Sequence, residues 1–116
     1  MNNYKSGNLA ELFARIYMRF HGYQILSKNY VTGKGTHAGE VDFIAKLGKT
    51  IAFVEVKKRK DIDSAAYSLT ERQKQRVRRG AEAYLKHNPH FQNYDIRFDA
   101  VLVEFPFTIL HFRDAF

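Results

Sequence analysis

Asp42, Glu55 and Lys57 are the residues of this chain whose types and spacing could do chemistry. Each is expected in a strand, and because side chains alternate along a strand, Glu55 and Lys57 share one face. Two carboxylates held close together repel one another unless a cation joins them. Hard divalent ions take carboxylate and carbonyl oxygens, so Val56 could add its backbone carbonyl to the two acids. These residues predict a site for Mg²⁺ or Mn²⁺ of the kind used by metal-dependent phosphodiesterases.

A tight hairpin is expected to bring the two acids together. Gly48 comes first in a two-residue loop, which suits a primed turn closed by Leu47 and Thr50. In that register Asp42 stands opposite Glu55, with their Cβ atoms about 5 Å apart. The alternative is a hairpin whose exposed face carries these charges as an ordinary solvated set.

The strand that carries Glu55 and Lys57 is expected to be covered on both faces. Ile51 and Phe53 precede the two charged residues on their own face, and the residues between them make the other face apolar. Burying charge without compensation is costly. A site at the end of a buried strand therefore explains the charges better than solvation does.

The motif resembles that of the PD-(D/E)xK nuclease superfamily, with Asp42 as the first acid and Glu55-Val56-Lys57 as the second acid and the lysine. From about residue 7 to residue 116 the chain resembles the uncharacterised bacterial YraN-type family, which is similar to archaeal Holliday-junction resolvases. The resemblance implies an endonuclease fold, branched DNA as a substrate and a symmetric homodimer. Four segments carry it: Gly7-Asn8-Leu9-Ala10-Glu11, Gly39-Glu40-Val41-Asp42, Phe53-Val54-Glu55-Val56-Lys57-Lys58-Arg59 and Arg97-Phe98-Asp99.

A first helix is expected at about residues 6–21. Gly7, Ala14 and Met18 form a weak apolar stripe, and Glu11 lies between that stripe and the polar face. Glu11 either projects into a polar pocket, where the resemblance implies that it completes the metal shell directly or through water, or faces water near the helix N-terminus. The larger apolar residues recur at helical spacing and are expected to form the core stripe: Leu9, Leu12, Phe13, Ile16, Tyr17 and Phe20.

A second helix is expected at about residues 68–87, beginning with a capping box at Thr70. Extending its inward face back by one turn reaches Gln73 and Lys74, which could bind phosphate or orient the site; Lys74 reaching out to solvent is the alternative. The inward face is expected to consist of Val77, Ala81, Tyr84 and Leu85. The residues expected to contact nucleic acid are Lys58, Arg59, Lys60, Gln73, Lys74, Arg76 and Arg79.

Strands are expected at about residues 23–30, 39–46, 50–58, 94–104 and 108–113. With the two helices they predict an α/β fold of the restriction-endonuclease-like class, in which a central mixed sheet is flanked by two main helices in an αβββαβ core. Arg97 and Asp99 are expected to make a structural ion pair or a contact at the sheet edge. Glu40, opposite Lys57 in the proposed register, is expected to tune the site.

The 116 residues fit one domain, 1–116, and their net charge of +7 favours a polyanionic partner, most plausibly DNA. The chain has no Cys, its five histidines show no zinc spacing, and it has no apolar run for a signal peptide or a membrane span, so a cytoplasmic location without membrane association is expected. The predicted function is an endonuclease in which Lys57 orients the attacking water or offsets charge. The alternatives are a noncatalytic nucleic-acid-binding module of the same fold and an adaptor for an acidic protein surface.

Overall fold

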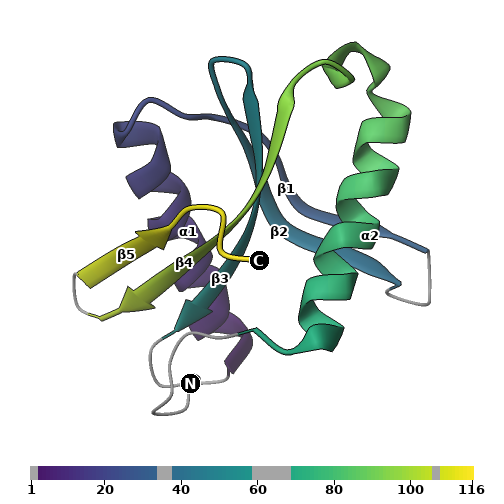
Figure 1. Cartoon of the computed structure of the whole chain (residues 1–116). Helices are drawn as coiled ribbons and strands as arrows, with labels where there is room; N and C mark the ends of the chain where they lie inside the picture. Colours follow the sequence, from purple (N-terminus) through teal and green to yellow (C-terminus); the bar gives the residue numbers. More distant parts are fainter. Residues whose placement is uncertain (1–2, 34–37, 59–68, 106–107) are drawn as a thin grey trace.

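The structure, a computed structural model, describes residues 3–33, 38–58, 69–105 and 108–116 (Figure 1). Its elements come in the predicted order, with a short 3₁₀ helix added after the second long helix. They are α1 (Asn3–Phe20), β1 (Gln24–Thr32), β2 (Gly39–Leu47), β3 (Thr50–Lys58), α2 (Glu71–His87), η2 (Pro89–Phe91), β4 (Asp95–Glu104) and β5 (Thr108–Phe112).

The strands form one mixed sheet in the order β1-β2-β3-β4-β5. All neighbouring pairs are antiparallel except β3 and β4, which run parallel and are joined through α2. The two long helices lie on opposite faces of this sheet (Figure 1). The predicted α/β fold with an αβββαβ core is therefore confirmed.

The hairpin between β2 and β3 has the predicted register. Leu47 pairs with Thr50, and the pairing continues to Phe43 opposite Val54. Gly48 has a φ of 59°, the left-handed conformation that a primed turn requires at its first loop position. This turn fixes which side chains of the two strands share a face.

The central strand β3 is buried on both faces, as predicted. Ile51 and Phe53 pack in a cluster with α2, whereas Ala52 and Val54 pack in a second cluster with α1. Such alternation of two apolar faces is expected where a strand is covered by helices on both sides. The charged end of β3 consequently continues from a buried strand.

Helix α2 buries the predicted face and begins at the predicted capping box. The Thr70 side chain accepts a hydrogen bond from the Gln73 N–H, and the Gln73 side chain accepts one from the Thr70 N–H. A Cβ added at Gly39 would lie 2.7 Å from the backbone nitrogen of Gly80, so these two glycines allow α2 to lie directly on β2. The buried residues of the helix are Val77, Gly80, Ala81 and Tyr84.

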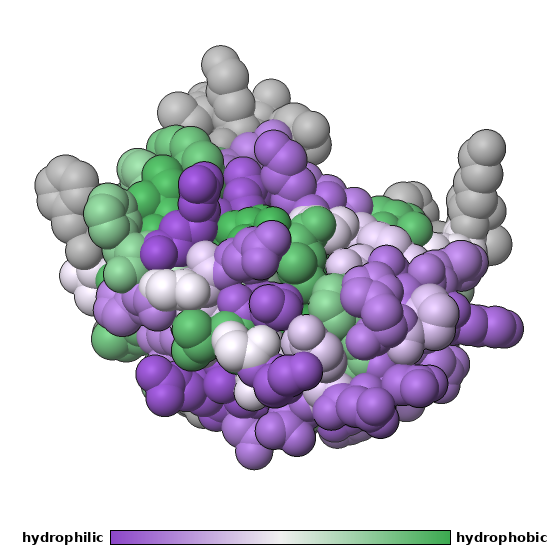
Figure 2. All heavy atoms as spheres, turned by 90° about the horizontal axis from the view of Figure 1, so that it is seen from above, coloured by the Kyte–Doolittle hydropathy of each residue, from purple (hydrophilic) through white to green (hydrophobic). Residues whose placement is uncertain are grey.

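The predicted core face of α1 is wrong. The fully buried residues of this helix are small or flexible, namely Ala10, Ala14 and Met18, because they let the helix approach the sheet closely. Much of the large apolar stripe faces outward: Leu9, Leu12, Ile16 and Phe20 are all exposed. Apolar side chains also interrupt the mainly hydrophilic surface in Figure 2. None of the described helices is long and apolar enough to cross a membrane.

Asp99 is the centre of a buried polar network between β4 and β5. Its carboxylate accepts hydrogen bonds from Arg97, from His111 Nε2 and from the Asp114 N–H at 2.7–3.0 Å. Burial alone would raise the pKa of Asp99, but the hydrogen bonds from His111, Arg97 and Asp114 outweigh it and lower this pKa. Arg97 also donates to the Tyr23 hydroxyl at 2.6 Å. The predicted structural ion pair of Arg97 and Asp99 is confirmed.

Asp99→Asn should lower the free energy of unfolding by about 3–5 kcal/mol, because it leaves a buried guanidinium without its counter-charge. Since folding lowers the pKa of Asp99, the contribution is present above the ordinary carboxyl pKa and disappears as pH falls through the folded-state pKa. Urea unfolding at several pH values measures both effects. The control is Asp95→Asn, an exposed carboxylate on the same strand; an equal loss in both variants would contradict the assignment.

Candidate metal and nucleic-acid site

Four carboxylates from three elements converge where β2 and β3 separate. Glu11 comes from α1, Glu40 and Asp42 come from β2, and Glu55 comes from β3. The β2–β3 ladder ends at the pair of Phe43 with Val54, one step before Asp42 and Glu55. Glu40 lies close enough to raise the pKa of each of the other three. The ends of the two strands therefore carry the acidic centre that the sequence predicts.

Asp42 marks an irregular point in β2. Val41 packs with the α2 cluster and Phe43 with the α1 cluster, although residues two apart on a regular strand share a face. Opposite this point, Asn29 of β1 has a φ of 53°. Asp42 Oδ2 accepts a hydrogen bond from the Val56 N–H at 2.7 Å, which ties its carboxylate to β3. The distortion turns Asp42 toward the neighbouring strand.

Among Glu11, Asp42 and Glu55, the pKa is raised most for Glu55. Burial and the charge of Asp42 raise the pKa of Glu55 to about 8, against the opposing effects of Lys57 and Arg76. Burial raises the pKa of Asp42 to about 6, although the hydrogen bonds from Val56 and Glu55 lower it. The Lys57 ammonium lies 3.8 Å from a Glu55 oxygen. Asp42, Glu55 and Lys57 are thus brought together as predicted.

Glu11 lies in the polar pocket, which decides between the two positions that the sequence allowed. Its Oε1 is buried and has no hydrogen-bond partner within the described residues. Burial and the Asp42 charge raise the pKa of Glu11 to about 7, although Arg15 lowers it. The sequence analysis missed Arg15 as a residue of the site. Its position four residues after Glu11 on the same helix places the two side chains next to each other and could have indicated it.

The donor set suits a hard divalent cation. Glu11, Asp42 and Glu55 supply only oxygen atoms, the ligands that Mg²⁺ and Mn²⁺ prefer. The Glu11 oxygen has no partner among the described residues, and the pKa values of Glu11, Asp42 and Glu55 are raised. Both features are expected of clustered acids whose charge no cation offsets. Within the residues that the structure describes, no three His, Asp or Glu side chains are already arranged around one ion. Their side chains would have to turn to share one.

The expected basic surface is only partly where the sequence placed it. Lys58 is 8% exposed and lies inward, because it follows Val54 and Val56 on the face of β3 that packs with α1. Gln73 is occupied in the capping box, and Lys74 forms an ion pair with Glu71 at 3.6 Å. Arg59 and Lys60 lie outside the described residues. These positions correct the expectation of an exposed basic run starting at Lys58.

Two arginines of α2 remain near the site. Arg76 lowers the pKa of Glu55 through its charge, and its buried Nε has no partner among the described residues. Arg79 is exposed, and its guanidinium donates to the Ala38 carbonyl oxygen at 3.4 Å, where β2 is about to begin. Both side chains are placed to meet an anion that approaches the acidic centre from the side of α2.

Comparison with known proteins places the chain in a family. The family described as "Uncharacterised protein family UPF0102" matches residues 10–103. The chain belongs to the UPF0102 family. A UPF0102 protein of Paramagnetospirillum magneticum is 46% identical over 99 residues, which cover 85% of this chain and 77% of the relative. One of Rhodopseudomonas palustris is 45% identical over 100 residues, 86% of this chain and 73% of the relative.

UPF0102 membership confirms the YraN-type resemblance seen in the sequence. The matched region contains Glu11, Asp42, Glu55 and Lys57, so all four belong to the part of the chain that the family shares. The family is described as uncharacterised, so membership assigns no activity to these residues.

Glu55→Gln should stabilise the metal-free protein at pH 8 by about 1–3 kcal/mol, because it removes a buried negative charge. Folding raises the pKa of Glu55 from 4.5 to about 8, so wild-type stability should fall as pH rises through this window. Below pH 4.5 the Glu55 carboxyl is neutral in the folded and in the unfolded wild-type protein, so the stabilisation by Glu55→Gln should vanish. Urea unfolding in the presence of a chelator measures the free energy of unfolding across this range.

The matched control for this change is Glu82→Gln, an exposed acid on α2. It should leave the free energy of unfolding unchanged within about 0.5 kcal/mol at every pH. A gain for Glu55→Gln that is as large at pH 4.5 as at pH 8 would show that packing, and not charge, is responsible.

Proposed function

We propose that this protein is a divalent-metal-dependent endonuclease. The single observation that carries the proposal is the convergence of half-buried Asp42 and buried Glu55 with Glu11 and Lys57 at the end of β3. A structural role does not need three acids placed so that the charge of Asp42 raises the pKa of the other two, since burying uncompensated charge costs stability. Perturbed acids of this kind cluster at functional sites.

The residues divide the work of phosphodiester cleavage among them. Asp42, Glu55 and Glu11 would hold Mg²⁺ or Mn²⁺, with the Val56 carbonyl as a further oxygen ligand. A bound ion lowers the pKa of water and offsets charge on the phosphate oxygens. Lys57, which is 20% exposed, can reach both the carboxylate centre and solvent, so it would orient the attacking water or stabilise the developing charge.

A polyanionic substrate is supported by the charge of the protein. The net charge is +7, and Arg72 and Arg79 are exposed on α2, on the same side of the helix as Arg76, whose charge acts on Glu55. Cations placed beside the acidic centre can hold the phosphate backbone while the acids act on one linkage. DNA, including the branched DNA implied by the likeness to junction resolvases, is the proposed substrate, and a symmetric dimer is the proposed form.

Asp42→Asn should abolish cleavage and weaken metal binding by at least tenfold, because one of the negative ligands is lost. Calorimetric titration with Mg²⁺ and Mn²⁺ measures the affinity for the ion. Nuclease assays on single-stranded, duplex and four-way-junction DNA measure the cleavage rate. The exposed Asp95→Asn variant is the control. Wild-type protein that binds these DNAs but cuts none of them with Mn²⁺ would favour a noncatalytic binding module.

Lys57→Ala should lower kcat about 100-fold or more while metal affinity changes less than threefold, since the lysine acts on the reacting phosphate and not on the ion. Single-turnover cleavage and calorimetry give the two quantities separately. Lys46→Ala, on the neighbouring strand at the opposite end of the hairpin, is the control. Equal losses of metal affinity and turnover in Lys57→Ala would assign this lysine a structural role.

A further inference from the structure

The exposed apolar stripe of α1 borders a groove that the proposed reaction does not use. The groove lies between α1 and the edge strand β1 and encloses about 360 Å³. A second hollow of about 400 Å³ shares Ile16 and Arg19 with it and reaches Phe20. Together they follow the helix from Leu12 to Phe20, about 12 Å of the stripe.

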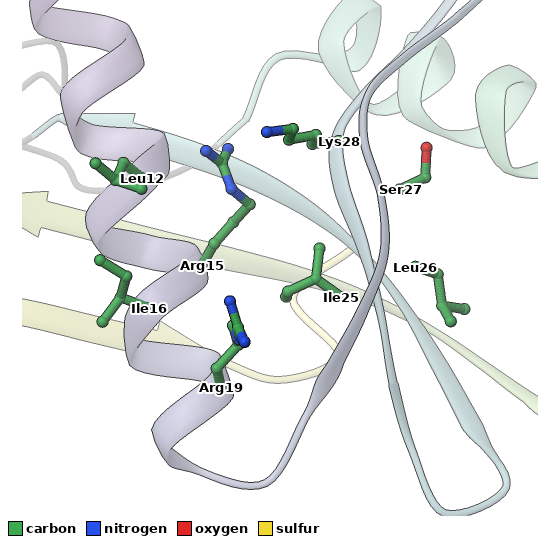
Figure 3. A pocket seen from close by; sticks show the side chains of 8 residues that line it. All are labelled: Leu12, Arg15, Ile16, Arg19, Ile25, Leu26, Ser27 and Lys28. Atoms are coloured by element: carbon green, nitrogen blue, oxygen red, sulfur yellow. The ribbon is translucent and has the colours of Figure 1, made fainter.

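The groove combines an apolar lining with one sign of charge. Ile25 of β1 points toward α1, and Arg15 and Arg19 project from the helix toward β1 (Figure 3). Lys28 extends from β1 toward the helix at one end. No acidic residue lines this groove, and none of the ion pairs between described residues involves any of the three cations.

We infer that this groove binds an acidic amphipathic segment of another protein. Apolar side chains of the segment would cover Leu12, Ile16 and Ile25, and its carboxylates would meet Arg15, Arg19 and Lys28. A helix of three or four turns has the length of the stripe and presents apolar residues at the same spacing. Charge complementarity indicates that the partner is acidic, because burying the stripe also brings its neighbours close to Arg19, Lys28 and Arg15, although Arg15 also acts on Glu11.

Three other occupants fit the groove less well. A second copy of this chain in a symmetric dimer would place the same patch against itself, arginines included. Nucleic acid suits the charges, but its bases stack on aromatic rings, and none of the described residues that line this groove is aromatic. A bilayer surface is flat and would leave a concave lining uncovered. An acidic, partly apolar protein segment satisfies the shape, the apolar lining and the charge together.

Site-specific photocrosslinking in living cells tests the inference. A photoreactive amino acid replaces Ile16, which is 40% exposed, and in a control protein it replaces Ile96, which is 38% exposed on β4. We expect a protein adduct at position 16 alone, with the crosslinked peptide rich in Asp, Glu and large apolar residues. Adducts with this same chain, with nucleic acid or with lipid, or no adduct at all, would overturn the inference.

The crosslinked peptide is then synthesised and its affinity for the purified protein is measured by fluorescence anisotropy. Arg15→Glu with Arg19→Glu should weaken binding by at least tenfold, because attraction becomes repulsion. Ile16→Ser should weaken it by about tenfold through lost apolar contact, whereas Lys86→Glu and Ile96→Ser should not. Affinity that survives the double charge reversal and the Ile16 change would refute a docking site in this groove. Because nuclease activity is not a readout, failure here leaves the proposed reaction unaffected.

Discussion

Asp42 lies between Glu11 and Glu55 and raises the pKa of both, so the protein holds like charges where they repel one another. This repulsion costs folding energy that the rest of the structure has to supply. The sheet does so by covering β3 on both faces with separate apolar clusters. On the neighbouring strand β4, where it pairs with Val54, Asp99 shows the contrasting solution, in which a buried carboxylate is met by Arg97 and His111. The structure thus pairs the carboxylate of Asp99 with positive charge, and it leaves the cluster of Glu11, Asp42 and Glu55 short of positive charge.

The local backbone explains how the acids come together. A regular ladder would carry Asp42 along the same face as its neighbours two residues away, but the facing of β2 changes between Val41 and Phe43. The Val56 N–H, which lies beyond the end of the β2–β3 ladder, then donates to the Asp42 carboxylate. Irregular strands are common beside active sites for this reason, since they aim a side chain that a regular strand would not. The separation of β2 and β3 therefore creates the site.

Sequence reasoning succeeded where a local rule decides the geometry. The glycine at position 48 fixed the hairpin turn, and the turn fixed the register from which the proximity of Asp42, Glu55 and Lys57 followed. The capping box at Thr70 likewise set the start of α2. The same rule limits Gln73, because a side chain that caps a helix is not free to bind phosphate. Lys58 was misjudged because a run of charges suggests a surface, while this residue continues the buried face of Val54 and Val56.

The face of α1 could not be predicted because two apolar stripes compete and size favours the wrong one. With about 100° per residue, the centre of the exposed stripe lies about 150° around the helix from the buried residues Ala10, Ala14 and Met18. Glu11 lies about 60° from that buried centre, so rotating the helix to bury Leu12 and Ile16 would carry Glu11 away from Asp42. The alanines also permit a close approach to the sheet that leucine and isoleucine would prevent. Placing Glu11 at the acidic centre therefore leaves the large apolar residues outside, beside Arg15 and Arg19.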